Sequence, residues 1–500
     1  MRPLARCVMV QGTASGVGKS VVATALCRVL RDAGFRVAPF KAQNMSLNAA
    51  VTSAGEEIGR AQAAQAEAAG IEPRATMNPI LLKPEGESRS QLVVLGRARG
   101  SLAAREYWTR RSALWPVVTK ALTELRREFD VVVIEGAGSP AEVNLRRTEI
   151  ANMRVALVSD AAVLLVADIE PGGVFAQVLG TLGLLRPRER ALVRGVIVNK
   201  FRGDPALFAS GVRYLRRVSG TPVLGVLPYL DEMPVPSEDS LSLDLPSRDG
   251  PLDVAVVRYP RISNFDDFSA LASAGARVRF VRRSHELGVP DLVILPGSKA
   301  TVADLEWLRA TGIAARVIAL VDAGVPLVGI CGGFQMLGRG LADPDGVEGP
   351  ATRVRGLGLL PARTVFTVAK RTVIVRGRVA HGGMFERLAG AAFTGYELHV
   401  GATTRDGATH FAELVRDGGA RRVREGAVSA DGRVIGTYLH GLFANAAVRD
   451  AILMPLAARR GIAFTPRTIV EDRYAVLADW FRAAVDTQRL LRVAGLQHRG

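Results

Sequence analysis

The chain has 500 residues, of which 48% are hydrophobic and 23% charged, and its formal net charge at pH 7 is +17. This length is enough for two to four domains with buried cores, and the composition excludes a disordered chain, a coiled coil and a collagen-like repeat. No apolar run reaches the roughly 18 residues that a membrane span needs, and the three cysteines are too few for a disulfide framework, so we expect a cytoplasmic protein.

The basic surplus comes almost entirely from arginine, and the arginines are scattered along the chain. They are not interleaved with aromatic residues and they match no nucleic-acid-binding module. We therefore expect neither a nucleic acid nor a membrane as partner. A substrate with several negative charges is the better functional explanation, because positively charged clefts concentrate such ligands.

Short β-branched runs alternate with helical stretches along the first half, and the same rhythm restarts after a Pro-, Ser- and Asp-rich stretch at 233–250. This pattern predicts an α/β fold with parallel sheets, in which ligands bind beyond the carboxyl ends of the strands. A helical tail is expected over 451–500. The predicted strands are Cys7–Val10, Val131–Ile134, Ala162–Val166, Gly195–Val198, Val223–Val226, Asp253–Val257, Val278–Val281, Leu292–Leu295 and Leu327–Ile330.

A glycine-rich loop follows the first predicted strand and leads into a helix. It has the P-loop pattern except that Thr13 occupies a position where a glycine is usual. In such a loop the backbone N–H groups wrap the phosphates, Lys19 reaches the β- and γ-phosphate oxygens, and the Ser20 hydroxyl binds Mg²⁺. We therefore predict an ATP site, whose loop residues are Gly12, Thr13, Gly16, Gly18, Lys19 and Ser20.

Acidic residues end two of the later strands. A P-loop site needs a carboxylate that holds Mg²⁺ directly or through water, and Glu135 is the first candidate, with Asp168 as the second. Lys41 follows another probable strand and could bridge a substrate carboxylate and the γ-phosphate. The alternative for each of these residues is a solvated side chain in a strand-end loop.

Cys331 lies between an apolar strand and a helix start, with glycines on both sides in Gly329-Ile330-Cys331-Gly332-Gly333. Such a tight turn exposes the side chain, and a helix N-terminus favours the thiolate. His440 is the one histidine in a comparable setting, so the two are predicted to pair for acyl transfer. The N–H groups of Gly297 and Gly332 are expected to form the oxyanion hole.

Longer segments carry a resemblance to known families. Residues 251–450 resemble the glutaminase domain of class I glutamine amidotransferases, and residues 1–232 are similar to dethiobiotin synthetase in the P-loop, Lys41 and Glu135. The whole chain resembles the cobyric acid synthase family. The matching segments are Pro39–Asn48, Met77–Pro84, Val198–Asp204, Ile262–Phe265 and Gly395–His399.

The resemblance implies a fold and a reaction. The fold would be a P-loop synthetase domain followed by a flavodoxin-like glutaminase domain, with Asn199 in the nucleotide site. Cys331 and His440 would release ammonia from glutamine. ATP and Mg²⁺ would activate four peripheral carboxylates of adenosylcobyrinic acid a,c-diamide as acyl phosphates, with Lys41 taking part, and channelled ammonia would displace the phosphate.

Some positions depart from the family pattern. Leu442 stands where many class I glutaminases have a Glu that orients the histidine, so another group has to orient His440. Ala300 stands where Asn is expected, and Pro171 where Arg is usual, which weakens the expectation for the loop at 168–173. Tyr396, Glu397 and His399 are as consistent with packing as with substrate contact.

Three other interpretations fit part of the sequence. The sister enzymes that amidate the a and c carboxylates share both chemistries, but Gln43-Asn44-Met45 and Met77-Asn78-Pro79 argue against them. A partitioning-type P-loop switch would carry a lysine at the position of Ala14 and would have no use for a Cys–His pair. A catalytically inactive scaffold would not need two sites with all their reactive groups.

Overall fold

The computed structural model describes residues 3–86, 88–230, 249–467 and 472–497, and these divide into two compact units. Unit 1 comprises 1–46, 57–236 and 471–500, and unit 2 comprises 47–56 and 237–470. The expected linker at 233–250 falls almost wholly outside the described residues. The last part of the C-terminal stretch, from residue 471, belongs to unit 1.

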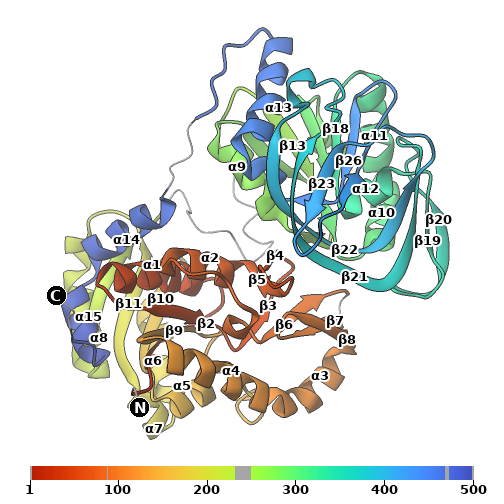
Figure 1. Cartoon of the computed structure of the whole chain (residues 1–500). Helices are drawn as coiled ribbons and strands as arrows, with labels where there is room; N and C mark the ends of the chain where they lie inside the picture. Colours follow the sequence, from red (N-terminus) through yellow and green to blue (C-terminus); the bar gives the residue numbers. More distant parts are fainter. Residues whose placement is uncertain (1–2, 87, 231–248, 468–471, 498–500) are drawn as a thin grey trace. The chain divides into compact units, whose positions relative to one another are not determined.

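The core of unit 1 is a parallel sheet of six described strands (Figure 1). Most of these strands are apolar and fully buried, as expected for a sheet that is covered on both faces. The order is β12 (Val223–Pro228), β11 (Val193–Phe201), β10 (Ala162–Asp168), β1 (Arg6–Gly12), β9 (Val131–Glu135) and β2 (Val37–Phe40).

Helices cover both faces of this sheet, and in Figure 1 α1 and α2 lie above it and α4 and α5 below. The first helix, α1, starts directly at the end of the glycine loop, which places the P-loop at the carboxyl edge of the central strand. The helices are α1 (Lys19–Asp32), α2 (Arg60–Ala69), α3 (Ala104–Arg110), α4 (Trp115–Glu128), α5 (Met153–Ser159), α6 (Val174–Leu184), α7 (Pro187–Arg190) and α8 (Ala209–Ser219).

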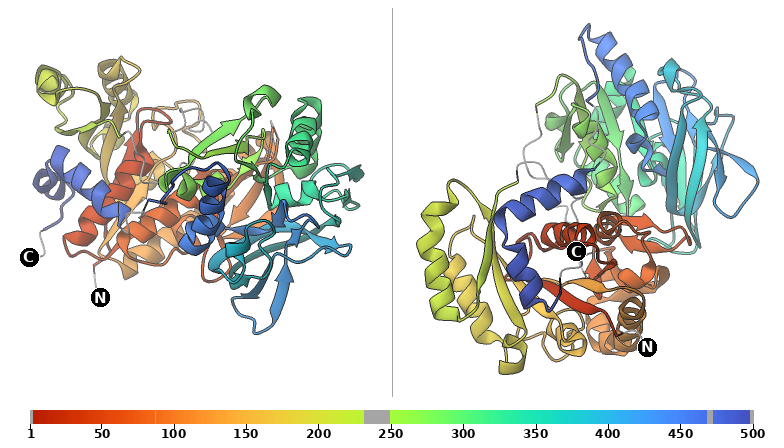
Figure 2. Two further views of the ribbon diagram at one scale, coloured as in Figure 1. Left: turned by 90° about the horizontal axis from the view of Figure 1, so that it is seen from above. Right: turned by 60° about the vertical axis from the view of Figure 1, so that its left-hand side comes forward.

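The last two helices, α14 (Arg473–Ala484) and α15 (Thr487–Val493), pack against α1 and the neighbouring strands (Figure 2). Their apolar faces join the core of unit 1, with Leu477 and Phe481 buried beside Leu26 and Leu30. Arg28 of α1 also forms a bidentate ion pair with Asp472, at 2.7 Å for both bonds. These helices therefore complete the P-loop unit.

A smaller sheet stands apart from the main one in unit 1. Its order is β3 (Gln43–Met45), β6 (Ile80–Pro84), β7 (Arg89–Val94) and β8 (Arg97–Ala103). The first pair is parallel and the others are antiparallel. This sheet contains Gln43–Met45 of the Pro39–Asn48 segment and Ile80–Pro84 of the Met77–Pro84 segment.

Unit 2 has its own mainly parallel sheet, with the strand order typical of flavodoxin-like folds. The order is β15 (Arg277–Val281), β13 (Asp253–Val257), β16 (Leu292–Leu295), β18 (Leu327–Ile330), β26 (Val434–Thr437) and the antiparallel edge strand β25 (Ala427–Val428). Its helices are α9 (Ser269–Ser273), α10 (Thr301–Ala310), α11 (Ile313–Asp322), α12 (Gly332–Leu337) and α13 (Ala446–Arg459).

A second, mostly antiparallel sheet in unit 2 was not expected from the sequence. Its centre is the long hairpin of β21 (Ala362–Val379) and β22 (Ala392–Arg405). The remaining strands are β19 (Gly340–Asp343), β20 (Thr352–Arg355), β23 (Ala412–Arg416), β24 (Arg422–Glu425) and β27 (Leu439–His440). This sheet matters for function because it carries His440.

All nine strands predicted from the sequence are present, and no end differs from the predicted one by more than three residues. In the described part of the chain, no helix is both long enough and apolar enough to cross a membrane.

Candidate functional sites

The P-loop connects β1 to α1 in unit 1. Gly16 and Gly18 have positive φ angles of 72° and 98°, which favour glycine. A Cβ atom on Gly18 would lie 2.2 Å from Nδ2 of Asn199, so only glycine fits there. Asn199 itself donates from Nδ2 to the carbonyl of Val17 at 2.9 Å. The structure thus brings Asn199, from β11, against the loop.

Two further loop residues have definite partners. The Lys19 ammonium folds back over the loop and donates to the carbonyl of Ala14 at 2.8 Å. The Thr13 hydroxyl donates to Gln177 at 3.1 Å, and the Thr13 N–H bonds to the carbonyl of Val166 at 2.9 Å. The residue in the variant position of the P-loop therefore anchors the loop to the neighbouring strand and to α6.

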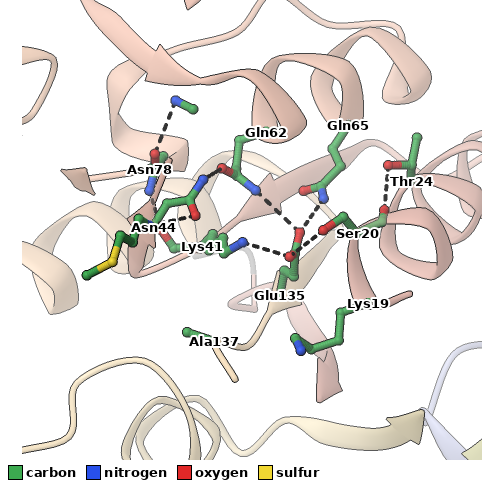
Figure 3. A network of polar contacts seen from close by, with 12 residues as sticks. Lys19, Ser20, Thr24, Lys41, Asn44, Gln62, Gln65, Asn78, Glu135 and Ala137 are labelled. Atoms are coloured by element: carbon green, nitrogen blue, oxygen red, sulfur yellow. Dashed lines mark hydrogen bonds and ion pairs between the residues drawn. The ribbon is translucent and has the colours of Figure 1, made fainter. Parts of the chain in front are cut away.

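Glu135, at the end of β9, is the centre of a buried polar network (Figure 3). Its Oε1 accepts from the Ser20 hydroxyl and the Lys41 ammonium, both at 2.8 Å. Its Oε2 accepts from Gln65 at 2.6 Å and from Gln62 at 3.3 Å. Ser20, Lys41 and Glu135, which the sequence analysis chose separately, thus lie together. Gln62 and Gln65 were not predicted as site residues, although they lie three residues apart and therefore on one face of the Ala-rich helix α2.

Electrostatics keep this carboxylate charged. Burial alone would raise the pKa of Glu135, but the Lys41 ammonium and the hydrogen bonds from Gln65 and Ser20 hold the pKa below its ordinary value. A charged carboxylate and a hydroxyl in contact are oxygen donors of the kind that Mg²⁺ uses together with nucleotide phosphates. Ser20 and Glu135 therefore fit a magnesium site.

Asp168, the second candidate for the metal, has different partners. At the end of β10 its Oδ2 pairs with the Lys200 ammonium at 2.6 Å, and its Oδ1 accepts from the Glu170 N–H at 2.9 Å. Lys200 has a positive φ of 62°. Asp168 thus forms an ion pair with Lys200, and these contacts do not include Glu135. Among the residues that the structure describes, no three His, Cys, Asp or Glu side chains lie close enough together to hold a metal ion.

In unit 2, Cys331 occupies a strained turn between β18 and α12. Its φ of 51° is unusual for a residue with a side chain, and such strain is common at functional positions. A Cβ on Gly333 would lie 1.9 Å from the carbonyl of Leu295, so the turn cannot tolerate a larger residue. The Cys331 thiol is buried and lies 3.6 Å from the carbonyl of Leu398.

His440 lies beside this thiol, on β27. Burial would lower its pKa, but the Asp267 carboxylate and the adjacent Cys331 side chain together raise the pKa of His440 to about 10. The histidine is therefore favoured as an imidazolium next to the cysteine. The predicted oxyanion-hole residues border the same place: a Cβ on Gly297 would lie 3.3 Å from Cε1 of His440, and a Cβ on Gly332 would lie 2.8 Å from the N atom of Ser298.

Asp267 orients the histidine, and it was not predicted from the sequence. Its Oδ2 lies 2.7 Å from Nδ1 of His440, and its Oδ1 accepts from the Gly441 N–H at 2.8 Å. Asp267 is buried on the short helix η5 (Phe265–Phe268). It thus takes the place of the Glu that position 442 lacks. The signal in the sequence was an acidic residue set between phenylalanines in Asn264-Phe265-Asp266-Asp267-Phe268.

Tyr396, Glu397 and His399, for which the sequence allowed either packing or substrate contact, have different surroundings on β22. The Tyr396 ring stacks on His440, with centroids 5.2 Å apart and an interplanar angle of 20°. Glu397 is buried and paired with Arg416. His399 stacks on Tyr438 at 3.7 Å, and burial lowers the pKa of His399 to about 4. Tyr396 is thus the member of this group that contacts the Cys331–His440 pair.

Comparison with known proteins agrees with this division. Residues 8–242 match the model of the CobQ/CobB/MinD/ParA nucleotide binding domain, and residues 253–448 match that of the CobB/CobQ-like glutamine amidotransferase domain. Curated relatives match both halves together.

One is the cobyric acid synthase of Sorangium cellulosum (strain So ce56), which is 49% identical over 98% of this chain and 99% of its own length. The cobyric acid synthase of Moorella thermoacetica is 47% identical over 99% and 98% of the two chains, and that of Dehalococcoides mccartyi (strain CBDB1) is 46% identical over 98% and 99%. With this identity along nearly the whole of both chains, the protein belongs to the cobyric acid synthase family.

Proposed function

We propose that this chain is a glutamine-hydrolysing adenosylcobyric acid synthase. It would amidate the b, d, e and g carboxylates of adenosylcobyrinic acid a,c-diamide, with ATP and Mg²⁺, to give cobyric acid. The observation that carries the proposal is that a Cys–His–Asp cluster and a P-loop with a buried Lys–Glu pair occur in one chain whose full-length relatives are named cobyric acid synthase.

In the glutaminase unit, the Cys331 thiolate attacks the amide carbon of glutamine. A C–S bond forms, and the carbonyl oxygen becomes an oxyanion that the N–H groups of Gly297 and Gly332 stabilise. The C–N bond then breaks as the His440 imidazolium gives its proton to the departing ammonia. His440 next accepts a proton from water, which hydrolyses the thioester to glutamate, and Asp267 holds the ring in one orientation throughout.

In the synthetase unit, the P-loop N–H groups and Lys19 hold the phosphates of ATP. Lys41 holds the carboxylate of the acceptor close to the γ-phosphate, and the Glu135 carboxylate, 2.8 Å from the Lys41 ammonium, holds that ammonium in place. Ser20 and Glu135 would hold Mg²⁺, which would neutralise charge on the phosphates. A carboxylate oxygen attacks the γ-phosphorus and ADP leaves, and ammonia then attacks the acyl carbon and phosphate leaves.

Two variants separate the two chemistries. Cys331→Ala should lower glutamine-dependent amidation on the order of 10³-fold or more, because the nucleophile is gone, yet keep amidation with added ammonium salt. Lys41→Ala should lose amidation with either nitrogen donor and still hydrolyse glutamine. Amidation is measured by chromatography of the corrinoid, and hydrolysis by the release of glutamate.

The two variants should lose opposite activities, and a different result in either one would contradict the role proposed for that residue. Loss of ammonium-dependent amidation in Cys331→Ala would make the cysteine structural, and normal amidation in Lys41→Ala would remove Lys41 from the activation step.

A further inference from the structure

The segment 47–56 belongs to a different compact unit from the residues before and after it in the sequence. Residues 1–46 and 57–236 belong to unit 1, but 47–56 belong to unit 2. The segment contains the short strand β4 (Ala49–Val51) and follows the Lys41 region of the chain. The mechanism proposed above uses Lys41 but assigns nothing to 47–56.

Two consecutive residues of the segment bind the part of unit 2 that holds His440. Oδ1 of Asn48 accepts from the backbone N–H of Phe265 at 3.1 Å, and Asn48 has no exposed surface. The carbonyl of Ala49 accepts from Nδ2 of Asn264 at 3.1 Å and from the Tyr396 hydroxyl at 3.3 Å. Nδ2 of Asn264 also donates to the Tyr396 hydroxyl, at 2.8 Å.

The residues that Asn48 and Ala49 contact are close to His440 in the structure. Phe265 is the first residue of η5, the helix that carries Asp267, and Asp267 binds Nδ1 of His440. Tyr396 covers one face of the same imidazole ring. The edge and the face of the His440 ring are therefore fixed by two groups, and both of them are tethered to Asn48 and Ala49.

The backbone conformation before η5 explains why the hydrogen bonds from Asn48 and Ala49 would stabilise this region. Asn264, just before η5, adopts a left-handed conformation with a φ of 51°, which is uncommon for residues other than glycine although Asn adopts it more readily than most. Such a conformation persists only when its surroundings hold it. Loss of the bond from the Phe265 N–H to Asn48 would leave a buried donor unsatisfied and favour a rearrangement of η5.

We propose that Asn48 is a positioning residue of the glutaminase site, which acts through Phe265 and Asp267 on His440. This inference rests on the proposed function, because it concerns the same Cys331–His440 chemistry. It assigns to the glutamine-hydrolysing centre a residue from the N-terminal half of the sequence. Because Asn48 acts here on the position of His440 and not on bound glutamine, its removal should lower the catalytic rate and leave the binding of glutamine unchanged.

The test compares variants of the full-length protein in glutamine hydrolysis and in ammonium-dependent amidation. Asn48→Ala should lower kcat for glutamine hydrolysis about 10- to 100-fold and leave KM within about twofold, because a small misplacement of a catalytic group has effects of this size. Ammonium-dependent amidation should stay within about twofold of wild type. Asn48→Asp keeps the acceptor oxygen for the Phe265 N–H and should recover most of the lost rate.

Thr52→Val is the matched control. Thr52 is buried in the same segment, and its hydroxyl accepts from the Glu56 N–H at 3.1 Å, a bond that stays within the segment. It should hydrolyse glutamine like wild type. The inference is overturned if Asn48→Ala keeps its kcat, if Asn48→Asp is as slow as Asn48→Ala, or if Thr52→Val is equally slow. Absence of glutamine hydrolysis in the wild-type protein would instead contradict the proposed function.

Discussion

His440 is held by groups that serve different purposes. The Asp267 carboxylate bonds to Nδ1 and favours the charged ring, whereas the Tyr396 ring stacks on its face and limits its rotation. Burial works in the opposite direction and would lower the pKa of His440. Because its pKa nevertheless rises to about 10, the electrostatic effect of Asp267 and Cys331 outweighs the cost of burying the charge.

Replacement of Asp267 by Asn should therefore change both the rate of glutamine hydrolysis and its pH dependence. An amide keeps the size of the side chain but does not stabilise the imidazolium. The alkaline limit of activity, set by loss of the His440 proton, should move from near pH 10 to lower pH. We also expect kcat to fall on the order of 10²-fold, because the ring loses the partner that fixes its tautomer.

The measurement is kcat/KM for glutamine hydrolysis from about pH 6 to about pH 10.5. Asp266→Asn is the control, since it removes the same charge from the neighbouring residue, and it should keep the alkaline limit of wild type. An alkaline limit that stays in place in Asp267→Asn would show that Asp267 does not set the charge of His440.

At the scale of single residues, the sequence predicts those functional residues whose immediate neighbours in the chain form a recognisable motif. Cys331 between glycines and the P-loop around Lys19 are examples, and the structure places each at the end of a strand. Asp267 was not predictable in the same way, because its contact with His440 joins residues far apart in the chain. Gln62 and Gln65 could not be predicted for a similar reason. Glutamines on a helix are common, and only the fold brings these two to Glu135.

At the scale of whole elements, the C-terminal helix α14 is the clearest case of packing that contributes to a distant part of the chain. Phe481 on this helix is fully buried in the core of unit 1. Phe481→Ala should therefore destabilise unit 1 by about 3–5 kcal/mol, through lost burial and the cavity left behind. Val476→Ala, at a position of the same helix that is 56% exposed, should cost less than about 0.5 kcal/mol.

Hydrogen exchange in denaturant, followed peptide by peptide, measures this effect in each unit separately. The strands of unit 1 should lose protection in Phe481→Ala while those of unit 2 keep it. Equal protection in both variants would mean that α14 adds nothing to the stability of the P-loop unit.

The sequence predicted the parallel strands well, because continuous apolar runs that end in Gly or Asp leave few alternatives. It did not predict the hairpin of β21 and β22, two long strands in which buried residues are mostly interspersed with exposed or half-buried ones. The tail was expected to be helical, but an amphipathic pattern only indicates that one face is buried. It does not show which surface covers that face, so the packing of α14 on α1 could not be read from the sequence.

At the scale of the whole molecule, the chain combines two reactions that depend on one another. One releases ammonia and the other consumes it, and in bulk water at neutral pH ammonia is mostly protonated and not nucleophilic. In the proposed reaction, a chain that carries both sites would avoid this loss. The surplus of basic residues suits an acceptor with several carboxylates, because such a ligand is attracted by the net charge of +17.

The central claim is that this chain transfers the amide nitrogen of glutamine to carboxylates of a corrinoid. The most direct measurement is mass spectrometry of adenosylcobyrinic acid a,c-diamide after incubation with the protein, ATP, Mg²⁺ and glutamine labelled with ¹⁵N in its amide. We predict four successive exchanges of OH for labelled NH₂, all dependent on ATP. A corrinoid of unchanged mass, with glutamine hydrolysed and ATP present, would contradict the account.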